Sequence, residues 1–96
     1  MLKDISQKLY DLDDNVVVQM GKDVTMKDII IDVLMDNTID GAHLSGDQKL
    51  ERYTLAVRCK PSGEIEFSPE EIVLLKQLVG KKHNPLIVGQ FFEFCK

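Results

Sequence analysis

Two helix starts lie close together in the last third of the chain, Ser68-Pro69-Glu70-Glu71 and Asn84-Pro85-Leu86-Ile87. In the first, the serine can cap the helix and the proline suits the first helical position. The second glutamate can return a hydrogen bond to the capping residue. We expect this helix to stop at Gly80, with basic residues beside its C-terminus. The second start predicts a last helix.

The last helix is apolar on nearly every side, since only Gln90, Glu93 and Lys96 are clearly polar. One interpretation is a central core helix that the other helices cover. The other is a homodimer or partner interface, because large exposed apolar patches on small proteins generally mark contacts. That interface would comprise Val88, Phe91, Phe92 and Cys95. Gly89 costs about 1 kcal/mol relative to alanine inside a helix, which the close approach of another backbone would explain.

Upstream, the sequence predicts a hairpin followed by a helix. The β-branched run 16–20 favours a strand, Gly21 and Lys22 turn the chain, and residues 23–25 pair back. Thr25 and Asp28 have the spacing of a capping box, so a helix is expected from residue 26 to about 36. Its apolar residues recur with helical periodicity and predict a buried stripe, namely Met26, Ile29, Ile30, Val33 and Leu34.

Ser45 and Gln48 form another capping-box pattern, which predicts a helix ending near Cys59. We expect its buried side to contain Leu50, Tyr53, Ala56 and Val57. Residues 64–67 alternate polar and apolar side chains, as in a short, half-exposed strand. At the N-terminus, four apolar residues at near-helical spacing predict a first helix ending near residues 13–15, although residues 9–12 also alternate as a strand would. These four are Leu2, Ile5, Leu9 and Leu12.

The patterns together predict a mostly α, α+β fold in a single compact domain over residues 1–96. It would have four to five short helices and a small β-hairpin or a short two- to three-stranded sheet. Hydrophobic residues make up 44% of the chain and charged residues 29%, as is ordinary for a globular domain. No apolar run approaches the ~20 residues of a membrane span. The first fifteen residues lack the apolar core of a signal peptide, so we expect a cytoplasmic protein. Cys59 and Cys95 are expected to be reduced and buried.

Charge is unevenly distributed along the chain, whose formal net charge is −4. Residues 1–40 contain nine Asp and four Lys, whereas residues 41–96 contain seven acids and eight bases. Asp28, Asp32 and Asp36 are spaced to form an acidic stripe on one helix, where like charges repel by a few tenths of a kcal/mol per pair. The stripe is either a solvated face or a docking surface for a basic partner. As a docking surface, it would let the protein act as an acidic decoy for a nucleic-acid-binding host protein. Direct nucleic-acid binding is not expected, since Lys81-Lys82-His83 is a small basic cluster and the chain has no Trp.

His43 and His83 are the two histidines of the chain. Neither has the spacing from cysteines or acids that would build a closed zinc site. We therefore expect a non-enzymatic protein without a metal or cofactor. The alternative is a small ligand-binding domain or enzyme with a site near His43 or His83, which would also need Asp, Glu or Tyr53.

The second half of the chain resembles small accessory proteins of tailed bacteriophages and prophages. The resemblance lies in Leu44-Ser45-Gly46-Asp47-Gln48-Lys49-Leu50-Glu51-Arg52-Tyr53-Thr54-Leu55-Ala56, in the 68–79 helix, and in Gly80-Lys81 with Pro85-Leu86-Ile87-Val88-Gly89-Gln90. It implies a helical protein that binds a protein partner of host or phage origin, as a virion-assembly accessory or a modulator of a host factor. A structural component of a particle is a further possibility. The resemblance implies no catalytic residue.

Overall fold

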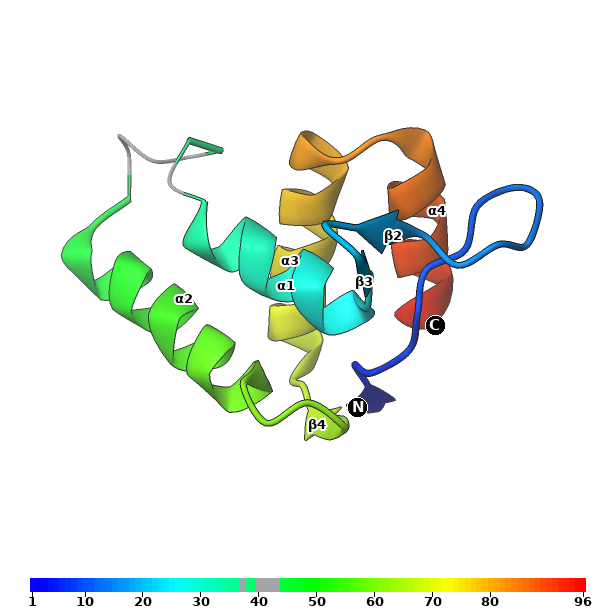
Figure 1. Ribbon diagram of the computed structural model, residues 1–96. Coiled ribbons are helices and arrows are strands. Elements are labelled where there is room, and N and C mark those ends of the chain that lie inside the picture. The colour runs from blue at the N-terminus through cyan, green and yellow to red at the C-terminus, as the bar shows by residue number, and fades with distance from the viewer. Residues whose placement is uncertain (37, 40–43) are drawn as a thin grey trace.

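The computed structural model describes residues 1–36, 38–39 and 44–96 (Figure 1). Within these residues the chain forms four α-helices and four short β-strands. The helices are α1 (Met26–Met35), α2 (Gly46–Cys59), α3 (Pro69–Lys82) and α4 (Pro85–Phe94). The strands are β1 (Leu2–Asp4), β2 (Val18–Gln19), β3 (Lys22–Asp23) and β4 (Glu64–Glu66). The described part is thus an α+β fold of mostly helices, which confirms the predicted fold class.

The helix starts lie where the capping patterns predicted them. Thr25, Ser45 and Ser68 each accept a hydrogen bond from the backbone N–H three residues on, and the side chain at that position returns one. Asn84 caps α4 by accepting from the Ile87 N–H at 3.1 Å. Each cap satisfies backbone donors that a helix leaves unpaired at its N-terminus.

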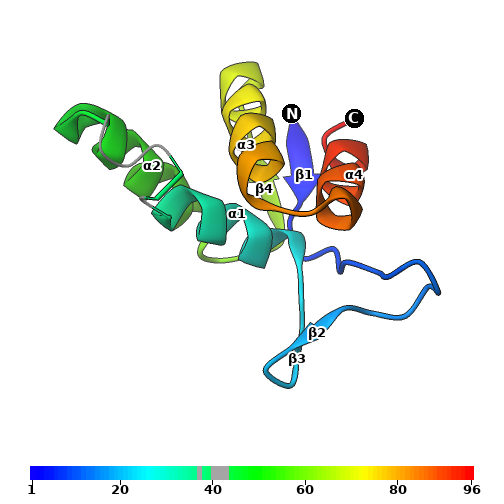
Figure 2. The same ribbon diagram turned by 90° about the horizontal axis from the view of Figure 1, so that it is seen from above.

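The predicted hairpin is also present. β2 and β3 pair antiparallel, with Val18 opposite Asp23 and Gln19 opposite Lys22. Gly21 turns the chain at φ +76°, a conformation that suits glycine because it has no Cβ. Figure 2 shows this hairpin standing apart from the four helices.

The expectation of a first helix over residues 2–12 is wrong. β1 instead pairs antiparallel with β4, with Leu2 opposite Glu66. After β1 the chain turns at residues 5–6 and then forms β-bridges from Lys8 to Thr25 and from Tyr10 to Val16, while the backbone N–H of Leu9 donates to the Val24 carbonyl at 3.0 Å. Ile5 and Leu9 are buried, which accounts for the apolar spacing without a helix.

Helix α3 extends three residues beyond its predicted last residue, Val79. Gly80 lies inside the helix, and the backbone N–H of His83 donates to the Val79 carbonyl at 2.9 Å. A glycine is tolerated within a helix, although it lowers helix stability. The additional turn places Lys82 beside α1, where it forms two ion pairs.

The core lies around α1, which packs against both α2 and α3, while α3 also packs against α4. Every residue of the predicted α1 stripe is buried. The buried side chains of the other helices include Leu55, Cys59, Leu75 and Phe91. Both cysteines are free and buried, as expected, and burial raises the pKa of each thiol.

The predicted buried face of α2 is largely wrong. Leu50, Tyr53 and Val57 are exposed, and of the predicted set Ala56 is buried. The buried residues are instead Arg52, Leu55, Ala56 and Cys59. Helix α2 is apolar on two opposite sides, and the sequence does not indicate which of them faces α1.

Candidate functional site

Helix α2 presents an apolar surface to solvent. Leu50 is 61% exposed, Tyr53 58% and Val57 46%, and the three lie within two turns of the same helix. Burying each of these side chains by half would contribute about 1 kcal/mol, given the 1.5–3 kcal/mol of complete burial. This apolar surface is therefore available to a partner and contributes little to folding.

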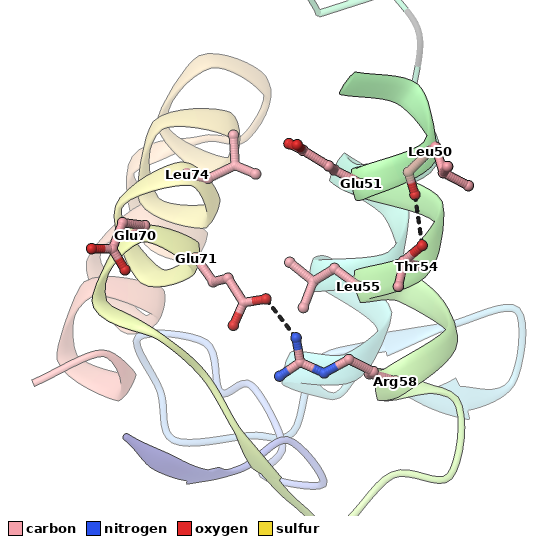
Figure 3. A pocket seen from close by; sticks show the side chains of 8 residues that line it. All are labelled: Leu50, Glu51, Thr54, Leu55, Arg58, Glu70, Glu71 and Leu74. Carbon is pink, nitrogen blue, oxygen red and sulfur yellow. Dashed lines mark hydrogen bonds and ion pairs between the residues drawn. The ribbon is translucent and has the colours of Figure 1, made fainter. Parts of the chain in front are cut away.

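The exposed surface continues into a groove between α2 and α3. The two helices converge near β4 and diverge away from it (Figure 1), and α1 packs against both of them. The α2–α3 groove has a volume of about 460 Å³, within the ~300–1,000 Å³ range of binding pockets. It is lined by Leu50, Glu51, Thr54, Leu55, Arg58, Glu70, Glu71 and Leu74. Figure 3 shows Leu55 and Glu51 reaching into the space between the helices.

Arg58 closes the narrow end of the α2–α3 groove. Its Nη1 lies 2.5 Å from Oε2 of Glu71, across the groove, and its Nη2 donates to the Glu66 carbonyl (Figure 3). Burial raises the pKa of Glu71, but hydrogen bonds from the Ser68 N–H and from Arg58 outweigh it, so the pKa lies below its ordinary value. Glu71 is therefore ionised at neutral pH. Its carboxylate accepts hydrogen bonds from the Ser68 N–H at the start of α3 and from Arg58 on α2.

Two further carboxylates line the α2–α3 groove, one on α2 toward its wide end and one in the first turn of α3, near its narrow end. Glu51 on α2 and Glu70 on α3 are exposed, and neither carboxylate has a hydrogen-bond or ion-pair partner among the residues described. The lining thus contains three carboxylates and one guanidinium. Sequence reasoning missed this site, although the second apolar side of α2 was a usable signal for it.

The predicted acidic stripe on α1 is largely engaged within the chain. Asp28 accepts from the Thr25 N–H at 2.9 Å as part of the cap. Lys82 Nζ lies 2.8 Å from a carboxylate oxygen of Asp32 and 2.7 Å from one of Asp36. The hydrogen bonds to these two aspartates raise the pKa of Lys82, and the pKa of Asp36 is lowered. A docking role for the stripe stays a prediction, with part of its charge neutralised by Lys82.

His83 borders a second cleft, of about 520 Å³, whose apolar lining includes Leu9, Val17 and Ile29. The Nε2 atom of His83 is buried and lies 3.3 Å from Oδ2 of Asp32, without the alignment of a hydrogen bond. His43 lies outside the described residues. The structure therefore places His83 beside Asp32, and the alternative of a ligand-binding or catalytic site near His43 or His83 stays a prediction.

The predicted interface on α4 is divided between core and surface. Phe91 is fully buried against Phe94, with ring centroids 5.6 Å apart, and Cys95 is buried as well. Val88 is half-buried, and Phe92 is exposed beneath Lys76, whose Nζ lies 4.8 Å from the ring centroid. A partner contact thus stays a prediction for these two residues alone.

The expected close approach of another backbone at Gly89 is not found, since a Cβ added there would meet nothing within 4 Å. The absence of a side chain at this position is therefore not required by packing against the described residues.

In comparisons with known proteins, no family model matches the sequence, and neither the curated proteins nor the solved structures give a match. Among the residues that the structure describes, no helix is long and apolar enough to cross a membrane.

Proposed function

We propose that this protein is a non-enzymatic accessory protein that acts by binding another protein through the α2–α3 groove and the adjoining surface of α2. The observation that carries the proposal is the exposure of Leu50, Tyr53 and Val57 beside that groove. Covering half of each side chain would contribute about 3 kcal/mol in total, or roughly a hundredfold in affinity. The resemblance to phage accessory proteins supports the same class of function, as a virion-assembly accessory or a modulator of a host factor.

The proposal is tested by affinity capture with a surface variant. Immobilised protein should retain a specific partner from a lysate of its native host, and the double variant Leu50→Asp, Tyr53→Asp should lose it. Both side chains are mostly exposed, so the variant should keep the helical circular dichroism of the wild type. Equal retention by the variant, or no specific retention by the wild type, would contradict the proposal.

A matched control is available at the other end of the molecule. Leu12 is 91% exposed and belongs to the loop 11–15, which lies far from α2 in Figures 1 and 2. The variant Leu12→Asp also introduces a charge at an exposed leucine. It should retain the partner as well as the wild type does.

The cleft beside His83 supports a second candidate function, the binding of a small ligand. Its apolar lining and its convergent polar groups, which include Asp32 and Asn84, are typical of small-molecule sites. A ligand from a fragment screen that changes the chemical shifts of the His83 ring until the change saturates, and leaves those of Leu50 and Tyr53 unchanged, would favour this function over protein binding.

A further inference from the structure

We propose that the segment bound in the α2–α3 groove is an amphipathic helix whose apolar stripe is flanked by lysine or arginine. This inference rests on the proposed function and specifies the chemical class of the partner. Two properties of the groove carry it, the kind of contact that its walls offer and the net negative charge of its lining.

The walls of the groove favour a helix over an extended segment. A peptide that binds as a β-strand needs a free sheet edge, because its backbone N–H and C=O groups must be paired. Here both walls are helices, whose backbone groups are paired internally, so they offer side chains alone. A helix satisfies its own backbone and can insert apolar side chains between two others. The groove is lined by residues of both α2 and α3, so a helix seated in it would contact both (Figure 3).

The apolar lining sets the spacing of the partner's anchors. Leu55 forms the buried wall of the groove on α2, and Leu74 lies opposite on α3 (Figure 3). Leu50 extends the apolar contact toward the exposed surface of α2. Apolar side chains at positions i, i+3 or i+4, and i+7 of a partner helix would lie on one face and meet these leucines.

The charge of the groove requires a basic partner. Glu51 on α2 points into the groove, and Glu70 in the first turn of α3 lies at its rim, pointing away from α2 (Figure 3). Neither has a hydrogen-bond or ion-pair partner in the described part of the chain, whereas Glu71 is matched by Arg58. An acidic segment would bring like charges together in a space from which water is partly removed, which is unfavourable. A segment with lysine or arginine beside its apolar stripe would place one basic side chain at Glu51, in the groove, and another at the rim beside Glu70.

The test uses three synthetic 16-residue helical peptides labelled with a fluorophore. The first has leucines at i, i+3, i+4 and i+7 flanked by lysines, the second has glutamates in place of the lysines, and the third has alanines in place of the leucines. Fluorescence anisotropy at 0.15 M salt should show the leucine–lysine peptide binding at least tenfold more tightly than either other peptide. Amide chemical shifts should change along α2 and α3.

Two charge variants separate a specific contact from general attraction to an acidic protein. The double variant Glu51→Gln, Glu70→Gln should weaken binding of the leucine–lysine peptide at least fivefold. The control Asp13→Asn, Asp14→Asn removes the same charge from the exposed loop 11–15. It should change the affinity for the leucine–lysine peptide less than twofold. Equal effects of the two variants would overturn the inference.

Other outcomes are equally decisive. If the glutamate peptide binds the groove as tightly as the lysine peptide, the basic partner is refuted while protein binding through the groove stands. If no peptide shifts the amides of α2 and α3, the helical occupant is refuted, and affinity capture alone decides the proposed function. If sedimentation equilibrium shows a dimer that Tyr53→Asp abolishes, a second copy of the chain covers the surface and the inference is overturned.

Discussion

Replacing Phe91 with alanine tests whether α4 is anchored in the core as the structure shows. The Phe91 side chain is 0% exposed and its ring lies 5.6 Å from that of Phe94, measured between centroids. The next residue, Phe92, is 39% exposed and lies beneath Lys76. The two phenylalanines are thus a matched pair, with the same side chain on the same helix in different surroundings.

The expected loss follows from this difference in burial. Removing a fully buried phenylalanine ring costs about 3–5 kcal/mol, because apolar contacts are lost and a cavity remains. Phe92→Ala removes a partly exposed ring and a cation–π contact, and should cost about 1 kcal/mol. Domains of this size have a free energy of unfolding of about 5–15 kcal/mol, so Phe91→Ala should remove a large share of it.

Urea unfolding followed by circular dichroism measures both variants. With a denaturant dependence of about 1.5 kcal/mol per molar, Phe91→Ala should lower the midpoint by about 2–3 M and Phe92→Ala by less than about 1 M. Equal shifts would refute the placement of α4. A larger shift for Phe92 would mean that the helix is rotated about its axis relative to the structure.

Three further predictions concern α4, the α3 cap and the ion pairs with α1. Gly89→Ala should raise the free energy of unfolding by about 1 kcal/mol, since the added methyl group meets nothing; a loss in a thermal melt would restore the hypothesis of a close neighbour. Ser68→Ala should cost about 1 kcal/mol in urea unfolding and Ser68→Gly a few tenths, whereas equal losses would contradict its capping role. The hydrogen bond from Lys82, and then those from Thr38, hold the pKa of Asp36 below its ordinary 3.8, so this carboxylate stabilises the fold above about pH 4 and the stabilisation is lost as the pH falls through the lowered pKa. In Lys82→Gln, a carbon-13 titration should show the pKa of Asp36 moving back toward 3.8, and an unchanged pKa would contradict the ion pair.

Local chemistry explains why most elements of this fold could be predicted. The caps at Thr25, Ser45 and Ser68 and the turn at Gly21 depend on residues within a few positions of one another. Such signals act wherever they occur in a chain. The sequence therefore predicts where the helices begin.

The errors arise where the structure depends on distant contacts. The apolar spacing of Ile5 and Leu9 fits a helix, but their backbone N–H groups donate to Gly63 and Val24. Gly80 is a common helix end, yet α3 continues to Lys82, whose partners lie on α1. Spacing within a segment contains no information about these partners.

The candidate site was missed for a related reason. The apolar residues of α2 form two sides, and packing against α1 buries Leu55 and leaves Leu50 and Tyr53 in solvent. From the sequence alone, the exposed side was taken for the core. The acidic lining of the groove combines Glu51 and Glu70, from two different helices, which no local pattern indicates. At the last helix the error is the opposite one, because Phe91 and Cys95 were candidates for an exposed interface and both are buried.

The pairing of β1 with β4 has a consequence for synthesis on the ribosome. Leu2 pairs with Glu66, so the first strand emerges from the exit tunnel long before its partner has been translated. Helices α1 and α2 can form meanwhile from neighbouring residues, whereas the backbone N–H of Ile5 has no partner until Gly63 has emerged. A nascent chain stalled before Gly63 should therefore bind ribosome-associated chaperones through its N-terminal segment. It should release them once α3 has been translated.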